Sequence, residues 1–197
     1  MARFDYTRLQ ETHDRFKAKR NEASQTGDFS ILADFWSTGD DVTYTWSGGL
    51  GKQDFVAKGR QELLKYVLGS ETAGHKGYTY PNYKDWPRAI DPEQGVIIEF
   101  WDTVSPFVRE DGSSIHVEGH GGTWIRFNDE YKIVMANDFF DQEANDAFFK
   151  ELIDRDLLDP LFKEHILEVW ARKADTDYRV TAEEIAKKAS AGASRTE

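Results

Sequence analysis

Residues 115–141 read IHVEGHGGTWIRFNDEYKIVMANDFFD, and this stretch decides the fold. β-Branched and aromatic residues alternate with polar ones on both sides of Asn128-Asp129-Glu130, which predicts two long antiparallel strands joined by a tight polar turn. Gly119, Gly121 and Gly122 lie inside the first strand, where glycine weakens a strand and often marks the close approach of another group. We therefore predict that this hairpin forms the floor of a cavity.

The overall composition limits the classes of partner. The chain has 197 residues, a formal net charge of -11 and no cysteine. Its acidic balance argues against nucleic acid or an anionic membrane as a partner, because either needs a basic surface. The lack of cysteine excludes disulfides, thiolate nucleophiles and Cys-ligated metals. No apolar run approaches the roughly 18 residues that a membrane span requires, so we expect a cytoplasmic protein.

The pattern along the chain predicts helices first and long strands afterwards. Helical spacing predicts helices over residues 6–23, from Asp28 onwards and from residue 59 onwards, with a strand over 42–46 between the last two. Residues 77–88 are predicted to form an edge strand, because they contain proline and a sheet tolerates proline only in its edge strands. Residues 96–108 predict one long strand, and helices return over 144–158 and 160–174 before a frayed tail at 187–197.

This element order predicts an α+β protein whose helices gather on one side of a strongly curved antiparallel sheet. We expect a first domain at residues 1–142, a helical C-terminal extension at 143–190 and a flexible tail at 191–197. Aromatic residues make up 14% of the chain, which suits a pocket for a flat, apolar ligand as well as a core.

Three segments resemble a known family: LADFWSTGDDVTYTW at residues 32–46, GVIIEFW at 95–101 and GHGGTWIRFNDEYKIVMANDFFD at 119–141. They look like the nuclear transport factor 2-like superfamily in its SnoaL-like branch, and the resemblance covers about residues 4–141. It implies a cone-shaped curved antiparallel sheet with three N-terminal helices that enclose a deep apolar pocket. The superfamily includes ketosteroid isomerases, scytalone dehydratase, polyketide cyclases, limonene epoxide hydrolase, lignin-diarylpropane lyases and non-enzymatic members, so the fold alone does not choose a function.

The catalytic residues of the steroid isomerases do not carry over. Aligning the family's strands puts its general-base carboxylate at Trp46, its oxyanion-hole aspartate at Thr123 and its helical tyrosine near Arg20. Scytalone dehydratase has a tyrosine at the Trp46 position and a pocket residue two positions earlier, which is Tyr44 here. A dehydratase-like site is therefore an open alternative, although its residues are not the same as those of the dehydratase.

The same alignment predicts which side chains face the pocket, because strand side chains alternate with period two. Asp138 becomes the leading carboxylate, since burial in an aromatic cavity raises the pKa of a carboxyl group, as a general acid or base near neutrality needs. The alternative is an aspartate that caps the C-terminal helices. The residues predicted to face inward are Val117, Gly119, Gly121, Thr123, Val134, Ala136, Asp138 and Phe140.

The row His116, Glu118 and His120 is predicted to lie on the opposite face. Same-face neighbours on one strand are about 6.5 to 7 Å apart, so these three splay and a metal site is not favoured. A catalytic histidine and a polar interface both remain open. A one-residue bulge at the glycines would turn this row inward.

Glu99 stands alone in the apolar run 96–101. A buried carboxylate must be paired or protonated, so Glu99 either bonds a group such as Arg60 or Arg126 or transfers protons. The aromatic residues expected to line the pocket are Tyr44, Trp46, Tyr80, Trp86, Trp101 and Phe140.

Two functions remain open. The first is a cofactor-independent lyase, without metal or organic cofactor, that performs elimination, dehydration or retro-aldol cleavage on a bulky aromatic or polycyclic molecule. The lignin-diarylpropane lyases suggest a lignin-derived aromatic dimer as one such substrate. The second is a non-catalytic ligand-binding or oligomerisation module, and in either case we expect a homo-oligomer, a dimer or a trimer. The first function assigns catalysis to Asp138, Glu99, Tyr44 and His120 and substrate binding to Trp46, Tyr80, Trp101, Phe140 and Thr123.

Overall fold

The computed structural model describes residues 2–46, 55–85 and 88–171. A six-stranded sheet has the strand order β2-β1-β8-β7-β4-β3, and β5 and β6 form a separate two-stranded sheet. β1 and β8 are parallel, whereas the other neighbours in the main sheet are antiparallel. The strands are β1 (Thr43–Trp46), β2 (Phe55–Lys58), β3 (Ala89–Asp91), β4 (Val96–Trp101), β5 (Val104–Val108), β6 (Ser114–His116), β7 (Gly121–Phe127) and β8 (Ile133–Phe140).

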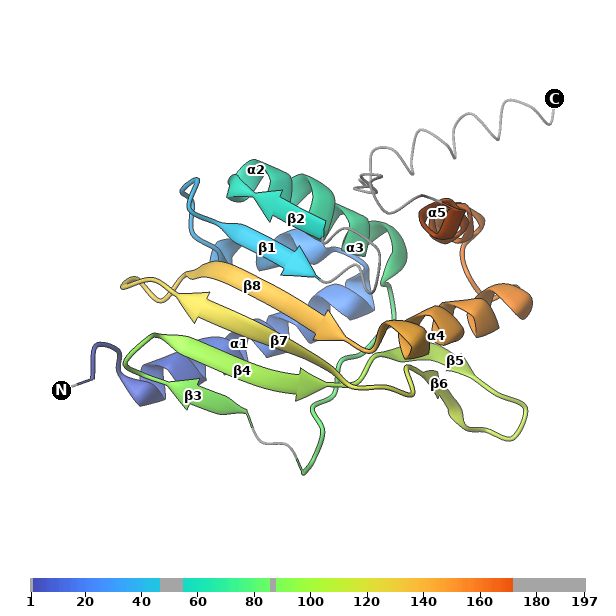
Figure 1. The fold of residues 1–197 in the computed structure, drawn as a ribbon, viewed down its shortest axis with the longest axis horizontal. Coiled ribbons are helices and arrows are strands. Elements are labelled where there is room, and N and C mark those ends of the chain that lie inside the picture. Colours follow the sequence, from blue (N-terminus) through green and yellow to red (C-terminus); the bar gives the residue numbers. More distant parts are fainter. Residues whose placement is uncertain (1, 47–54, 86–87, 172–197) are drawn as a thin grey trace.

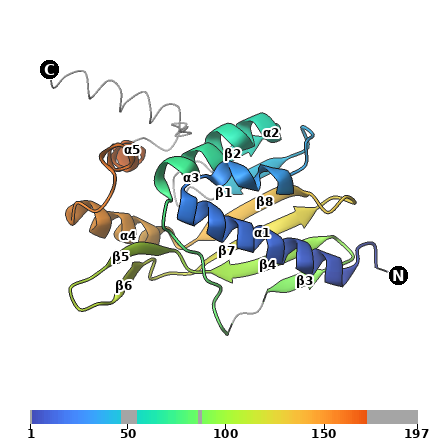
Figure 2. The ribbon, with the colours of Figure 1, turned by 180° about the vertical axis from the view of Figure 1, so that it is seen from behind.

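The helices that precede β3 cover one face of the main sheet, and α1 crosses that face diagonally (Figures 1 and 2). The two helices that follow β8 lie at one end of the molecule, beside β5 and β6 (Figure 1). This arrangement confirms the predicted α+β class with a curved, mostly antiparallel sheet. The helices are α1 (Tyr6–Thr26), η1 (Phe29–Phe35), α2 (Gly59–Glu62), η2 (Leu63–Leu68), α3 (Gly69–Gly74), α4 (Gln142–Asp154) and α5 (Pro160–Ala171).

The start and end of α1 follow from local sequence. The side chain of Asp5 accepts a hydrogen bond from the backbone N–H of Arg8 and so caps the first turn. Gly27 ends the helix at a φ of 82°, a left-handed conformation that glycine adopts without steric cost. Leu9, Phe16 and other residues at helical spacing form the buried face of α1, as the sequence predicted.

The predicted hairpin is present as β7 and β8, but its register contains a bulge. Phe127 pairs with Ile133, whereas Arg126 pairs with Met135, so Val134 is the extra residue. The bulge turns Ile133 toward the helices in place of Val134, which the sequence predicted to face inward.

Two strands predicted as continuous are each broken in two. The run 96–108 divides into β4 and β5, and the run 115–127 divides into β6 and β7, so that β4 pairs with β7 and β5 pairs with β6. The ladder of the main sheet ends at the Trp101 and Gly121 pair. A Cβ atom on Gly119 would lie 2.6 Å from the Cβ atoms of Asp141 and Ala144, so the chain between β6 and β7 lies against the start of α4.

The predicted edge strand at residues 77–88 is wrong for the part that the structure describes. Residues 77–85 make only isolated bridges, from Thr79 to Val104 and from Asn82 to Trp101. Pro81 interrupts this segment, and proline cannot donate to a ladder. The edge strand of the sheet is β3 instead. On the opposite edge, β2 was not predicted from the sequence, although Phe55 and Ala57 alternate with less buried residues there.

The C-terminal helices share a core with the two-stranded sheet. Ile115 and Val117 pack with Phe148, Leu152 and further apolar residues of the last two helices. Val117 was predicted to face the pocket and belongs to this second core instead, because it follows β6 in the two-stranded sheet and the chain enters the main sheet only at β7. This second core joins residues on both sides of residue 142, and the domain limit expected there stays a prediction. Trp86, the end of the second predicted C-terminal helix and the tail at 187–197 lie outside the described residues.

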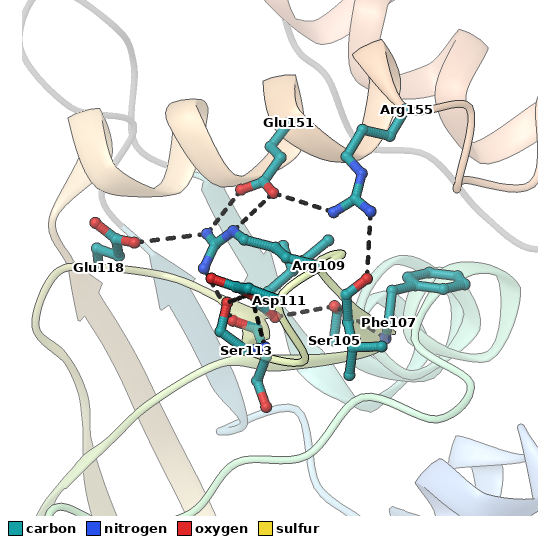
Figure 3. A network of polar contacts seen from close by, with 11 residues as sticks. Ser105, Phe107, Arg109, Asp111, Ser113, Glu118, Glu151 and Arg155 are labelled. Carbon is teal, nitrogen blue, oxygen red and sulfur yellow. Dashed lines mark hydrogen bonds and ion pairs between the residues drawn. The ribbon is translucent and has the colours of Figure 1, made fainter.

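A polar network fixes the β5 and β6 hairpin against α4 (Figure 3). Arg109 of the hairpin donates from Nε and from a terminal nitrogen to the two oxygens of Glu151, at 2.9 and 2.8 Å. Arg155 donates to the backbone oxygen of Val108 at 3.3 Å. The hairpin is thus held to α4 and its C-terminal end by these polar contacts and by the apolar contacts of the second core.

Candidate active site

A cavity of about 50 Å³ lies between the helices and the inward face of the main sheet. Its polar side chains come from α1, α3 and the strands β1, β4, β7 and β8, so that residues far apart in the sequence converge on one space. The lining residues are Phe16, Lys17, Arg20, Asn21, Leu32, Trp36, Tyr44, Val67, Leu68, Glu71, Tyr80, Glu99, Trp101, Thr123, Ile125, Ile133, Ala136 and Asp138.

Asp138 accepts hydrogen bonds at both carboxylate oxygens. Tyr44 donates its hydroxyl hydrogen to Oδ2, and the Thr123 hydroxyl lies 2.7 Å from Oδ1. The indole N–H of Trp101 donates to the Thr123 oxygen at 2.8 Å, so the hydrogen of Thr123 is free to point to Asp138. The result is an oriented chain from Trp101 through Thr123 to Asp138, with Tyr44 at the other oxygen.

Burial raises the pKa of Asp138 to about 6, although the hydrogen bonds from Tyr44 and Thr123 and the charge of Arg20 act in the opposite direction. Burial also raises the pKa of Tyr44, as does the negative charge of Asp138 beside it. Tyr44 therefore keeps its proton at neutral pH, while Asp138 titrates close to it. A pair with these properties can exchange a proton with a bound molecule.

Arg20 and Glu71 form a part-buried ion pair on the helical side of the cavity. The guanidinium of Arg20 lies 2.6 Å from Oε1 of Glu71 and 4.4 Å from the ring centre of Tyr80. Burial alone would lower the pKa of Arg20, but the charge of Glu71 together with those of other ionisable neighbours outweighs burial and raises the pKa, so Arg20 stays charged. The Tyr80 hydroxyl in turn lies 2.8 Å from Nδ1 of His75, whose pKa burial lowers.

Glu99 is held by three donors and is a carboxylate. His13 Nε2 lies 3.1 Å from Oε1, while Lys17 and Asn82 donate to Oε2 at 3.1 and 2.9 Å. Arg88 donates to Nδ1 of His13, which leaves the Nε2 hydrogen for Glu99. Burial alone would raise the pKa of Glu99, but the hydrogen bond from His13 and the charge of Lys17 outweigh it and lower the pKa to about 2.

The partners expected for Glu99 were wrong. Arg60 donates to the backbone oxygens of Ala33, Trp36 and Ser37 and so braces the end of η1. Arg126 is exposed on the outward face of β7. The donors that reach Glu99 come from α1 and from the segment before β3, which the sheet pattern does not relate to β4.

No family model matches the sequence, and no curated protein sequence matches it. Solved structures do match the fold. BvnE pinacolase from Penicillium brevicompactum has 11% sequence identity and a TM-score of 0.54, with 75% of this chain and 95% of that chain covered. PrhC from Penicillium brasilianum has 11% identity and a TM-score of 0.53 over 76% of this chain and 90% of that one. A putative isomerase from Bacillus subtilis has 14% identity and a TM-score of 0.52 over 74% and 94% of the two chains.

The chain shares the α+β fold of these structures, which is the architecture that the resemblance to the nuclear transport factor 2-like superfamily implies. Identities of this size show the fold alone and assign no activity. The predicted resemblance is therefore confirmed for the architecture, and the lignin-lyase subtype stays a prediction.

Within this fold, six predicted site residues line the cavity: Tyr44, Tyr80, Glu99, Trp101, Thr123 and Asp138. Trp46, Phe140 and His120 are not among its lining residues. Trp46 stacks on Phe55 with ring centres 3.7 Å apart, and Phe140 lies opposite Gly121 near the end of β8. His120 lies edge-on to Tyr83, with ring centres 5.7 Å apart.

His116 and Glu118 also lie away from the cavity. His116 Nδ1 is 3.0 Å from Oδ2 of Asp102, and Glu118 is exposed and 3.5 Å from Arg109. Within residues 2–46, 55–85 and 88–171, no three His, Asp or Glu side chains converge to hold a metal ion. In the same ranges, no helix has the length and apolar composition to cross a membrane.

The glycines of β7 let side chains and backbone approach the strand. A Cβ atom on Gly121 would lie 2.9 Å from the ring of Trp101, and one on Gly122 would lie 2.7 Å from the backbone oxygen of Glu99. The Trp101 ring, which lines the cavity, thus packs directly on Gly121. This contact agrees with the prediction that the hairpin forms part of the cavity floor. Gly119 was predicted to face the pocket but contacts the start of α4.

Sequence reasoning missed the charged residues of the helical wall. Arg20 was placed at helical spacing with Phe16 and at a family position that it does not match, and no role was predicted for Lys17. Lys17 lies four residues after the buried His13 and Arg20 lies four after the buried Phe16, so helical spacing is a signal that relates both to the cavity. Glu71 lies in a polar segment after the apolar run of η2, and no local pattern distinguishes it from an exposed glutamate.

Proposed function

We propose that the cavity is the active site of an acid/base lyase that acts on a hydroxylated aromatic small molecule. The observation that carries the proposal is Asp138, a buried carboxyl group with a pKa of about 6 that lines a cavity and shares a hydrogen bond with a tyrosine. A perturbed carboxyl group in a cleft is a marker of acid/base function. The aromatic lining residues Phe16, Trp36, Tyr44, Tyr80 and Trp101 favour a flat substrate.

The Asp138 and Tyr44 pair supports an elimination of water without a co-reactant. Asp138 takes a proton from the carbon next to the one that carries a hydroxyl group, the electron pair forms a carbon–carbon double bond, and the carbon–oxygen bond breaks. Tyr44 gives its proton to the departing hydroxide, and water leaves. Because Tyr44 and Asp138 share a hydrogen bond, the proton gained by Asp138 then restores Tyr44. In a retro-aldol cleavage Asp138 would take the proton of a hydroxyl group, the carbon that carries it would become a carbonyl carbon as its carbon–carbon bond breaks, and Tyr44 would give its proton to the departing carbon.

Glu99 and His120 have different places in this proposal. A pKa of about 2 keeps Glu99 ionised at neutral pH, so its role is to fix Lys17 at the cavity wall. His120 is 5.7 Å from the ring of Tyr83 and outside the cavity lining, so it takes no part in the proton transfer. Lys17 and Arg20 supply positive charge opposite Asp138, which would stabilise negative charge that develops on a substrate oxygen.

The size of the cavity limits the substrate. Its 50 Å³ is well below the roughly 300 to 1,000 Å³ of pockets that enclose drug-sized ligands. A lignin-derived aromatic dimer would thus place one ring at the cavity and the remainder outside its mouth, near the partly exposed Lys17 and Arg20. The name of BvnE as a pinacolase supports small-molecule chemistry on this fold.

The test compares wild type with Asp138→Asn and Tyr44→Phe on a panel of phenols that carry a hydroxyl group on the side chain. Turnover is followed by mass spectrometry as loss of water or of formaldehyde. We expect each variant to lower kcat by about 100-fold or more, since that is the usual contribution of a positioned acid or base. Tyr83→Phe is the matched control, because the Tyr83 hydroxyl bonds the backbone oxygen of Gly119 outside the cavity.

Wild-type activity in the Asp138→Asn variant would contradict the proposal. Saturable binding of the phenols without turnover by the wild type would favour the non-catalytic binding module instead.

A further inference from the structure

Two polar atoms of cavity-lining residues have no hydrogen-bond partner within the protein. They are Oε2 of Glu71 and the indole Nε1 of Trp36. Both residues are more than nine-tenths buried, with 7% and 3% of their surface exposed. A buried acceptor or donor left unpaired costs about 1–3 kcal/mol, and more when the group is charged. Each such atom at a cavity is therefore a place where a bound molecule can gain a hydrogen bond.

Glu71 differs in this respect from the other two carboxylates of the cavity. Asp138 accepts at both oxygens, and Glu99 accepts at both oxygens. Glu71 accepts only at Oε1, from Arg20. The unpaired oxygen thus belongs to a helix, whereas Tyr44 and Asp138 belong to strands of the sheet.

The charges around the cavity select the kind of group that Glu71 can take. Lys17 and Arg20 line the same cavity and disfavour a cation, while the carboxylates of Glu71, Glu99 and Asp138 disfavour an anion. A neutral donor meets neither penalty. An O–H group that donates to a carboxylate forms a charge-assisted hydrogen bond, which is about twice as strong as a neutral one.

We propose that Glu71 and Trp36 form a hydroxyl-binding subsite, in which Oε2 of Glu71 accepts the O–H of a neutral phenol or alcohol. The indole N–H of Trp36 donates to an oxygen acceptor of the same molecule. This inference rests on the proposed function for its meaning, since it names the substrate group that is held while Asp138 reacts with another part of the molecule. Glu71 is a binding residue in this scheme and transfers no proton to the substrate.

The test measures binding alone, so that it can fail or succeed independently of catalysis. Para-fluorophenol and para-fluoroanisole have the same ring, but only the phenol can donate a hydrogen bond. Their dissociation constants are measured by fluorine NMR titration with wild type, Glu71→Gln, Trp36→Phe and Asp138→Asn. We expect wild type to prefer the phenol by about tenfold or more, as a hydrogen bond to a charged group predicts.

The preference for the phenol should fall below about threefold in Glu71→Gln, because the phenol hydroxyl donates to Glu71. It should persist in Asp138→Asn, because the hydroxyl does not bond Asp138 in this scheme. Trp36→Phe should weaken both ligands to a similar extent, since each carries an oxygen acceptor.

Glu71→Gln leaves Arg20 buried without its counter-ion, which can unfold the protein. The double variant Arg20→Gln with Glu71→Gln removes both charges together, and it should also lose the preference for the phenol. Circular dichroism checks the fold of each variant.

The subsite would be overturned by equal binding of both ligands by wild type, by a preference that survives in both Glu71 variants, or by no saturable binding of either ligand. A preference lost only in Asp138→Asn would assign the hydroxyl to Asp138 and also overturn it. Loss of turnover in Asp138→Asn with an unchanged phenol preference would support both proposals. An unchanged turnover in that variant would remove the proposed catalysis and leave the subsite standing.

Discussion

The hydroxyl oxygen of Thr123 lies 2.7 Å from Oδ1 of Asp138, its partner across the β7 and β8 ladder. Because Trp101 donates to the same hydroxyl oxygen, Thr123 directs its hydrogen at Asp138. Tyr44 occupies the other carboxylate oxygen. These bonds favour the ionised form of Asp138, whereas burial favours the neutral form more strongly, and the balance gives the raised pKa. A carboxyl group with this pKa can gain or lose a proton near neutral pH. Its ionisation at neutral pH lowers the stability of the fold.

The dependence of stability on pH should therefore change when Asp138 is replaced. The pKa of about 6 in the folded state exceeds the value of about 3.9 for an unfolded aspartate, so the folded state binds this proton more tightly. The stabilisation is complete below about pH 4 and is lost as the pH rises through about 6, by roughly 3 kcal/mol in total. Asp138→Asn should remove this loss, which urea unfolding at several pH values would measure. An unchanged pH profile would refute the raised pKa, and exposed Asp129→Asn is the control.

Removal of the Tyr44 hydroxyl should move the acid limb of activity to higher pH. Tyr44 stabilises the carboxylate of Asp138, so Tyr44→Phe raises the pKa of Asp138 further and the base form appears later in a titration. We expect a displacement of roughly one pH unit in kcat/KM, with a similar displacement for Thr123→Val. Carboxyl carbon NMR would follow the same titration without a substrate. Tyr83→Phe should leave both profiles in place, and a shift to lower pH in Tyr44→Phe would contradict the assignment.

Glu99→Gln should lower the stability of the protein, and it should not remove a proton donor, because Glu99 is ionised at neutral pH. The folded-state pKa of about 2 lies below the ordinary glutamate value, so Glu99 contributes stability that is present above about pH 4.5 and is lost as the pH falls toward 2. The substitution leaves Lys17 and the buried His13 without their carboxylate, which should cost roughly 1–3 kcal/mol at neutral pH. Thermal and urea unfolding would measure it. The exposed Glu118→Gln should change stability little, and an equal effect of the two would argue against the buried cluster.

The C-terminal helices should be part of the folding unit. Leu152 of α4 is fully buried against Ile115 and Val117, so Leu152→Ala should cost about 2–5 kcal/mol. Limited proteolysis should then cut the β5 and β6 hairpin faster, because its apolar side rests on this helix. Leu64→Ala, at a partly exposed position, is the control. Wild-type stability and protease resistance in Leu152→Ala would support the predicted domain limit at residue 142.

Most of the fold follows from patterns that the sequence carries locally. Alternation with period two predicted β7 and β8 and the inward direction of Thr123 and Asp138, because a strand fixes the facing of its side chains. The breaks after Trp101 and before Gly121 were not predicted, since the alternation continues across both. Where a strand stops depends on whether its neighbour continues, and that neighbour is distant in the chain.

The sequence by itself therefore determined the α+β architecture and the inward direction of Asp138. Only the tertiary structure decided the charge pairs around it. Arg20 meets Glu71 across 51 positions, and Lys17 meets Glu99 across 82. No periodicity relates residues so far apart, and their pairing arises because α1 packs across the inward face of the sheet that the long hairpin of residues 115–141 helps to build.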